Sequence, residues 1–383
     1  MVAVAAVYLV TASYGPPVAN DPAAAAAGGW NLGARGAVEV PVGWGGRTDV
    51  WVVPGVDEAH HVDRFPGLLV WLAPGYAVAS WLGESRAAVG DDPLAVSSVP
   101  ATLTAALTAA AAIAVLLQVF RRIVPTGTAV RASLVVAFAT PLWSLAADAP
   151  WPHALTALLV AVSLWAAERP MAGWWAGAAA GLGVLTRPHL GLAQLVLGVG
   201  AVWRGCWRHA AGPVLGVLAG VALLVGYTAM TFGAAGLQAG YDPQPLVGRL
   251  VSLDPSFTLT QAYGAWFHPT RGVLVLTPVL FVLLPWVATA WRSSPPWVRA
   301  GAIGGALYLL VQYRLMPWSG GSGFFGYRTS IEGLLLASPL LLRCWADGAA
   351  TRKWWRRAGV VAVVAGVAIH GYGAVIGVRP PGG

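Results

Sequence analysis

Long runs of apolar residues, separated by short polar or basic segments, recur along the whole chain. A membrane-spanning helix needs about 20 mostly apolar residues, and most of these runs approach that length. The pattern predicts an all-α, polytopic membrane protein in which residues 1–383 form a single integral membrane domain. The apolar runs occupy residues 2–13, 66–83, 99–120, 132–147, 153–167, 171–186, 190–203, 212–233, 271–291, 300–316, 330–344 and 358–377.

Basic residues set the expected orientation of these helices. The positive-inside rule places in the cytoplasm the arginine-rich connections 121–131, 204–208, 292–299 and 343–357. This orientation requires that the run 66–83 does not cross the membrane, so we predict an interfacial or re-entrant helix there. About eleven spans remain. The two short ones, 171–186 and 190–203, are separated by Pro188, because proline ends or kinks a helix.

Two long connections, 14–98 and 234–270, face the outer side in this arrangement. The first begins with an alanine-rich stretch, which predicts an amphipathic helix over about 22–35. Apolar and polar residues alternate at 38–40 and 49–53, a pattern that predicts short strands followed by a Pro-Gly turn. We therefore expect the long first outer loop to carry folded structure of its own, including interfacial helices.

The composition supports a membrane location and excludes several classes of function. Hydrophobic residues make up 57% of the chain and charged residues only 10%, whereas soluble domains carry about 25% charged residues. Mean hydropathy is +0.67. A cytosolic enzyme, a DNA-binding regulator and a disulfide-stapled secreted domain are therefore excluded. The net charge of +8 is read as a topology signal, and no nucleic-acid partner is expected.

The choice of basic and sulfur-containing residues also bears on the location. Of the 23 basic residues only Lys353 is a lysine, which together with the alanine and glycine content indicates a GC-rich genome. We expect the cytoplasmic (inner) membrane of a bacterium, with the active site on the extracytoplasmic side. The two cysteines form no disulfide framework and no metal-binding spacing.

Arginines near the outer ends of the predicted spans are candidate ligands for an anion. Charged residues at membrane depth are costly and often functional, and guanidinium groups bind oxyanions with two hydrogen bonds. Arg187, Arg271 and Arg328 fit this description, although each could also extend to the interface as a structural residue. Residues 321–326 match Gly-x-Gly-x-x-Gly, but without a preceding strand they indicate a phosphate-binding turn rather than a dinucleotide site.

Acidic residues in the first outer loop offer two further sites. Asp21 is the leading candidate for a catalytic acid or base, and the alternative is an N-cap followed by Pro22 at the first helical position. The stretch 57–63, which contains two aspartates, a glutamate and two histidines, could bind a divalent cation. Its ligand spacing matches no known metal motif, so a solvated loop is the simpler interpretation, and no metal ligands are assigned.

Two segments give the chain a resemblance to a known superfamily. Tyr263–Leu280, which contains His-Pro-Thr-Arg, and Trp318–Arg328, which is followed by Glu332, resemble an outer-loop segment and a glycine-rich loop of bacterial GT-C glycosyltransferases. Arg64-Phe-Pro-Gly before an apolar segment is similar as well. Within this superfamily, the chain resembles protein-mannosyltransferase-like proteins of glycosyltransferase family 39 and actinobacterial mannosyl- or arabinosyltransferases. The motifs cover about a tenth of the chain, and the architecture covers most of it.

The resemblance implies an inverting glycosyltransferase that moves a sugar, mannose or arabinose, from a polyprenyl-phosphate donor to a glycan, lipid or protein acceptor. Asp21 would be the general base. Relatives often carry a second adjacent acid, but Asn20 stands at that position here, which argues against a metal-bridged pair. The remaining assignments are Arg271, Arg328, Arg64 and Arg187 to the donor phosphate, and His268, Trp318, Tyr327 and Glu332 to the acceptor or sugar.

The residues suit this chemistry independently of the resemblance. Phosphate is a good leaving group, so one base that accepts the acceptor's hydroxyl proton suffices, and the carboxylate pair of glycoside hydrolases is not needed. The main alternative is a transporter or flippase of lipid-linked saccharides. Transporters often contain two related halves with helix breaks at matching positions, and this sequence has one such break and no matching half. An inactive assembly partner is the third hypothesis.

Overall fold

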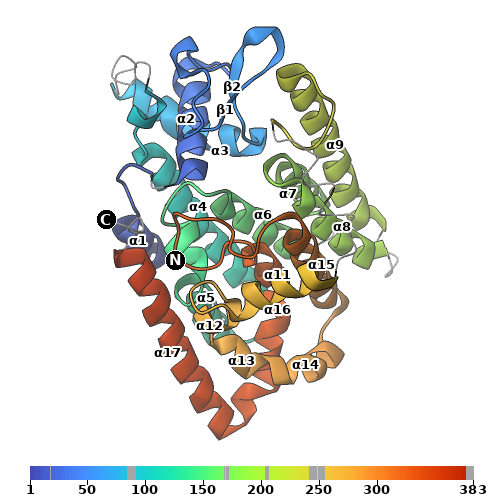
Figure 1. Ribbon diagram of the computed structural model, residues 1–383. Helices are drawn as coiled ribbons and strands as arrows, with labels where there is room; N and C mark the ends of the chain where they lie inside the picture. Colours follow the sequence, from blue (N-terminus) through green and yellow to red (C-terminus); the bar gives the residue numbers. More distant parts are fainter. Residues whose placement is uncertain are drawn as a thin grey trace.

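The computed structural model describes residues 1–17, 19–83, 92–167, 169, 172–202, 207–240, 248 and 255–376, and it is built mainly of helices (Figure 1). The elements of the first long loop are α2 (Asn20–Arg35), η1 (Val42–Trp44), β1 (Val52–Pro54), η2 (Val56–Glu58), β2 (His60–Val62), α3 (Pro66–Trp81) and η4 (Pro93–Ala95). The other helices are α1 (Val2–Thr11), α4 (Val99–Phe120), α5 (Thr126–Phe138), η5 (Leu142–Ala146), α6 (Pro152–Ala166), α7 (Gly173–Thr186), α8 (Pro188–Val202), α9 (Trp207–Phe232), α11 (Pro255–Phe267), α12 (Val273–Leu276), α13 (Val279–Leu283), η6 (Leu284–Trp286), α14 (Val287–Ser293), α15 (Pro296–Leu315), α16 (Ile331–Asp347), η7 (Ala349–Thr351) and α17 (Lys353–Ile376).

Several helices are long and apolar enough to cross a membrane. Among the described residues these are α4, residues 210–232 of α9, and α17, and shorter apolar helices accompany them. The chain is therefore a multi-pass membrane protein, as its composition indicates. The count of eleven spans stays a prediction, because many of the apolar helices have 10–17 residues.

Two predicted boundaries agree closely with the structure. Helix α4 occupies residues 99–120, the same range as the predicted run. The break between α7 and α8 falls at Arg187, whose backbone is extended with φ −152° and ψ 99°. Because the ring of Pro188 disfavours the helical conformation of the preceding residue, the arginine leaves the helix and its side chain emerges at the break.

Two other predicted spans are wrong as single helices. The run 132–147 is divided between α5, which ends at Phe138, and the π-helical turn η5. The run 271–291 is divided into α12, α13, η6 and α14. Prolines explain these breaks: Pro141 lies directly before η5, Pro278 directly before α13 and Pro285 within η6. Proline removes a helical hydrogen bond and clashes with the preceding turn.

Helices α7 and α9 run side by side in direct backbone contact. A Cβ added to Gly216 would lie 2.0 Å from the carbonyl oxygen of Gly177, and one added to Gly212 would lie 2.0 Å from that of Gly173. Both sets of glycines repeat every four residues, which places them on one face of each helix. Small residues at this spacing let membrane helices approach closely, so glycine is required at these contacts.

The first long loop folds into a helix pair and a small hairpin at one end of the bundle, at the top of Figure 1. Helix α2 packs on α3 so closely that a Cβ on Gly33 would lie 2.1 Å from the carbonyl oxygen of Ala73. The prediction of an amphipathic helix is wrong here: α2 is buried on nearly all sides, because the segments around Trp44 and Val62 cover the side that α3 leaves open.

The hairpin differs in detail from the predicted strands. Strands β1 and β2 pair antiparallel with Val52 opposite Val62 and Pro54 opposite His60. Pro54 therefore belongs to a strand rather than to the predicted turn, and η2 makes the connection. The stretch 38–40 contributes only an isolated bridge, between Glu39 and His61.

Arginines from two of the predicted cytoplasmic connections, 121–131 and 292–299, hold neighbouring segments of the bundle. Arg122 donates to the carbonyl oxygen of Ala167 at 2.8 Å and lies over the ring of Trp297. Arg299 donates to the carbonyl oxygen of Trp291 at 2.9 Å. The contacts of Arg122 therefore join segments that are far apart in sequence.

Candidate functional site

The carboxylate of Asp21 lies between two guanidinium groups. Its Oδ1 is 2.6 Å from Nη2 of Arg64, and its Oδ2 is 2.6 Å from Nη1 of Arg328. These partners are 43 and 307 residues away in sequence. The structure thus brings together three residues that the sequence analysis assigned to one site. Charge-assisted hydrogen bonds of this length are the strong ones.

Asp21 is not the N-cap of its helix. The N-cap of α2 is Ala19, and the Asp21 side chain makes no capping hydrogen bond, so the capping interpretation is wrong. Asp21 stands in the first helical turn, where the helix dipole favours a negative charge. Its side chain remains 32% exposed, whereas that of Arg64 is only 4% exposed. The carboxylate is therefore fixed by protein groups and still open to a ligand.

Each arginine is held by aromatic or backbone groups. Arg64 follows β2, donates to the carbonyl oxygen of Asp63 at 2.5 Å and lies 5.6 Å from the centre of the Trp51 ring. Arg328 lies over the rings of Trp151 and Phe324 at 5.0 and 5.5 Å. Stacking of this kind favours arginine over lysine, because the guanidinium group is planar.

Arg271 shapes the loop that carries Arg328. Its Nη1 donates to the carbonyl oxygens of Phe324 at 2.9 Å and Gly326 at 3.2 Å. Its guanidinium carbon lies 3.9 Å from the centre of the Phe324 ring, the same ring that Arg328 approaches. Arg271 and Arg328 are therefore neighbours across one aromatic side chain, as their assignment to one anion site requires.

The surrounding charges keep Asp21 ionised. Burial alone raises the pKa of Asp21, but the guanidinium groups of Arg64 and Arg328, with a further contribution from Arg187, outweigh it and hold the pKa below its usual value. Asp63 behaves in the opposite way, since burial raises its pKa to about 6. Asp63 is 3% exposed and belongs to the stretch 57–63, in which no sequence signal distinguishes it from its neighbours.

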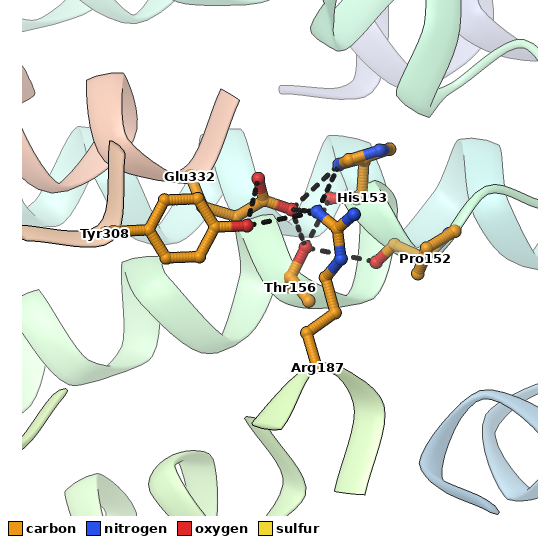
Figure 2. Close-up of polar contacts among 6 residues, drawn as sticks. All are labelled: Pro152, His153, Thr156, Arg187, Tyr308 and Glu332. Atoms are coloured by element: carbon orange, nitrogen blue, oxygen red, sulfur yellow. Dashed lines mark hydrogen bonds and ion pairs between the residues drawn. The ribbon is translucent and has the colours of Figure 1, made fainter. Parts of the chain in front are cut away.

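Arg187 and Glu332 belong to a buried network behind this site (Figure 2). Arg187 donates through Nη1 to Glu332 at 3.2 Å and to the hydroxyl of Tyr308 at 3.0 Å. Glu332 is fully buried, and its two oxygens accept from protein groups. The carboxylate is therefore the counter-ion of Arg187, and its burial corrects the assignment of Glu332 to the acceptor or sugar. The further partners of Glu332 are His153 at 2.8 Å and Thr156 at 2.6 Å.

The other residues assigned to the acceptor or sugar lie in two places. The rings of His268 and Trp318 are 4.3 Å apart, where α11 meets the loop after α15, and both are partly exposed. Tyr327 is 3% exposed, and its hydroxyl lies 2.8 Å from that of Thr277. Tyr327 therefore faces the interior of the bundle rather than the outer surface.

Tyr327 lines a large apolar cavity. The cavity has a volume of about 1100 Å³ and is lined by α5, α13, α16 and α17. Thr277 and Tyr327 lie in its wall next to the Arg328 loop, and Arg131 and Arg356 also line it. Ordinary ligand pockets measure roughly 300–1,000 Å³, so this cavity can hold a long apolar chain.

A metal site at 57–63 gains no support. Within the described part of the chain, no three histidine, cysteine, aspartate or glutamate side chains lie close enough together to hold a metal ion. His61 is buried against Phe232, with ring centres 5.8 Å apart, which is a packing contact.

Comparison with known proteins gives one structural relative. No protein-family model matches the sequence, and no curated protein matches it. The fold is similar to the crystal structure of ArnT from Cupriavidus metallidurans bound to undecaprenyl phosphate, with a TM-score of 0.55 and 18% sequence identity. The match covers 95% of this chain and 62% of that one. This likeness shows that the chain shares the fold of that structure, and it agrees with the predicted fold class, a mainly helical membrane protein.

Proposed function

We propose that the protein is a membrane glycosyltransferase that moves a sugar from a polyprenyl-phosphate donor to an acceptor on the extracytoplasmic side. The observation that carries this proposal is the Asp21 carboxylate held at 2.6 Å by both Arg64 and Arg328. One base beside a group of arginines is what transfer from a phosphate-linked sugar requires. The fold similarity to a protein bound to undecaprenyl phosphate supports the choice of donor.

Binding of the donor would proceed by exchange of partners. Arg64 and Arg328 hold Asp21 in the structure, and a phosphate is the stronger competitor for a guanidinium group because it carries more acceptor oxygens. When the phosphate takes these donors, the pKa of Asp21 rises toward its usual value. The carboxylate then becomes a better base at the moment when the donor is in place.

The reaction balances with one base and no general acid. The acceptor hydroxyl oxygen attacks the anomeric carbon of the donor sugar, and its proton passes to Asp21. The bond between that carbon and the phosphate oxygen breaks, and the oxygen keeps the electron pair. The products are the inverted glycoside and polyprenyl phosphate, whose added negative charge the arginines stabilise.

The net positive charge of the site favours departure of the phosphate from the sugar. The four guanidinium groups of the site still outnumber its carboxyl groups, which are Asp21, Asp63 and Glu332; the arginines are Arg64, Arg187, Arg271 and Arg328. The excess positive charge is suited to a phosphate, which gains negative charge as the sugar departs. Arg271 would also hold the loop of Arg328, since its Nη1 donates to two backbone carbonyls of that loop.

The apolar cavity would hold the polyprenyl chain. Its wall includes Tyr327, the direct neighbour of Arg328, so a phosphate at Arg328 places the first isoprene units at the cavity. The stacked rings of His268 and Trp318 would contact the sugar or the acceptor. Mannose or arabinose is the proposed sugar, and a glycan, lipid or protein the proposed acceptor, on the resemblance alone.

Transfer from labelled donors tests the proposal. Membranes carrying the protein are supplied with polyprenyl-phosphate mannose or polyprenyl-phosphate arabinose, and labelled product is counted. We expect Asp21→Asn to lower the rate at least about tenfold, as loss of a general base does. The matched control is Asp49→Asn, because Asp49 lies in the same loop and pairs with Arg47. Equal rates for wild type and Asp21→Asn would refute the role of Asp21, and lipid translocation without product would favour a flippase.

A further inference from the structure

Side chains from three other segments meet at the carboxylate of Glu332 in α16, as Figure 2 shows. His153 and Thr156 come from α6, Tyr308 from α15, and Arg187 from the break between α7 and α8. The shared acceptor is Oε1, which receives hydrogen bonds from His153 at 2.8 Å, Thr156 at 2.6 Å and Arg187 at 3.2 Å. Oε2 accepts from the Tyr308 hydroxyl at 3.0 Å. The carboxylate thus has no room for a ligand and acts only on its protein partners.

The network uses only one of the three nitrogens of the Arg187 guanidinium group. All hydrogen bonds from Arg187 to described residues leave from Nη1. The N–H groups of Nε and Nη2 donate to none of the described residues, and the side chain is 10% exposed. One edge of the guanidinium group is therefore fixed, and the other keeps its donors for another partner.

The position of the helix break brings Arg187 to the Asp21 site. Gly67 of α3 packs against the end of α7, where an added Cβ would lie 2.7 Å from Oγ1 of Thr186 and 2.8 Å from the carbonyl oxygen of Leu185. Arg64, which holds Asp21, stands three residues before Gly67. The positive charge of Arg187 is also among those that lower the pKa of Asp21.

We propose that Glu332 and Tyr308 are positioning residues that fix one edge of the Arg187 guanidinium group, so that its other edge binds the phosphate of the lipid-linked donor. This role rests on the proposed function, since it takes a polyprenyl phosphate as the ligand. The planar guanidinium group transmits the constraint: a hydrogen bond on Nη1 fixes the directions of the Nη2 and Nε donors.

A purely structural role explains the network less well. Burying a charged pair costs desolvation energy, and well-packed apolar residues often replace such pairs without loss of stability. Here the pair is buried at the second residue of α16 and beside a helix break, and it leaves donors of Arg187 unused within the described residues. Positioning an arginine for a ligand accounts for both features.

The test measures binding of undecaprenyl phosphate to the full-length protein in detergent micelles. The variants are Arg187→Gln, Glu332→Gln, Tyr308→Phe, and each of the last two combined with Arg187→Gln. We expect Arg187→Gln to weaken binding about tenfold, which corresponds to loss of one charge-assisted hydrogen bond. Glu332→Gln and Tyr308→Phe should each weaken it about three- to tenfold. In a protein that already carries Arg187→Gln, adding Glu332→Gln or Tyr308→Phe should weaken binding by no more than about a further twofold.

A matched control separates this effect from general damage to the bundle. Gln194 in α8 is 1% exposed and donates to Ser163 at 2.9 Å, so Gln194→Ala removes a buried polar contact away from the site. We expect it to lower the melting temperature and to leave the affinity unchanged. If Glu332→Gln fails to fold, the cycle with Tyr308→Phe decides, because that change removes a single hydroxyl.

The outcomes that overturn the positioning role are distinct from failure of the proposed function. The positioning role would be refuted if Glu332→Gln and Tyr308→Phe both bound the lipid with wild-type affinity. It would also be refuted if these changes weakened binding as much in the Arg187→Gln variant as in the wild-type protein. Tighter binding by Glu332→Gln would show that charge alone matters. Displacement of the lipid by inorganic phosphate at equal concentration would refute assignment to a lipid-linked phosphate. If the wild-type protein does not bind undecaprenyl phosphate at all, the proposed function itself is refuted.

Discussion

Replacing Asp21 should change donor binding and sugar transfer in opposite directions. In the structure its carboxylate occupies Arg64 and Arg328, the arginines that we assign to the donor phosphate. Carboxylate and phosphate therefore compete for the same donors. Asp21→Asn keeps the size of the side chain and removes the charge, so the competitor disappears while the arginines stay.

The size of the effect follows from the contacts. Hydrogen bonds to charged groups contribute about 1.5–3 kcal/mol each, and Asp21 makes two of them. A phosphate that displaces one of them in the wild type gives up at least about 1.4 kcal/mol, or a factor of about ten in affinity. We expect Asp21→Asn to bind undecaprenyl phosphate about tenfold more tightly, while it transfers sugar at least about tenfold more slowly.

The assay compares dissociation constants of undecaprenyl phosphate for wild type, Asp21→Asn and the control Asp49→Asn, each in the same detergent. Weaker binding by Asp21→Asn would contradict the competition between carboxylate and phosphate. It would instead indicate that Asp21 attracts the donor through a shared divalent cation. Addition of a chelator to the wild-type protein separates this case, since competition between two anions needs no metal.

Three further predictions concern stability and the cavity. Burial raises the pKa of Asp148 to about 7, so the folded protein loses stability as pH rises from about 4 to about 7. The Asp148→Asn variant, which can still accept a hydrogen bond from Ser13, should remove about 3 kcal/mol of this loss between pH 5 and 8. The melting temperature of this variant should therefore no longer fall over that pH range. Gly216→Ala places a Cβ 2.0 Å from a carbonyl oxygen of α7, so it should lower the free energy of unfolding by about 2 kcal/mol or more and the melting temperature with it. The control Gly226→Ala, at a position with open space around it, should leave the melting temperature unchanged. Val363→Trp places a larger side chain in the cavity. It should weaken binding of undecaprenyl phosphate severalfold and leave transfer from a short-chain donor unchanged. Equal losses with the long-chain and the short-chain donor would contradict a cavity that binds the polyprenyl tail.

Local signals in the sequence predicted much of the fold. The apolar run 99–120 has few competing signals and becomes α4 without change. Pro188 correctly marks the break after α7, because the restriction that proline places on its neighbour is local. Pro278 and Pro285 carry the same signal, yet the hydrophobicity of the run 271–291 masked it, and the prediction of one continuous helix failed.

Long-range packing decided what the sequence could not predict. Nothing in Asn20-Asp21-Pro22 shows that Ala19 rather than Asp21 caps the helix, or that α2 is covered on nearly all sides. Glu332 stands next to a glycine-rich loop in sequence, but its contacts with α6 and α15 place it in the interior. A charged residue at the predicted end of a membrane span is therefore a candidate functional residue, but the sequence does not show whether its side chain contacts solvent or protein.

The glycine contacts between α7 and α9 predict where mutations that abolish activity should arise. Arg187 directly follows α7, and α7 touches α9 through backbone atoms at Gly177 and Gly216, so no side chain can absorb a shift between the two helices. These glycines act as spacers that set the depth of the arginine. A genetic screen for lost activity should therefore recover alleles at these glycines together with alleles at Arg187, and compensating alleles should arise on the facing helix.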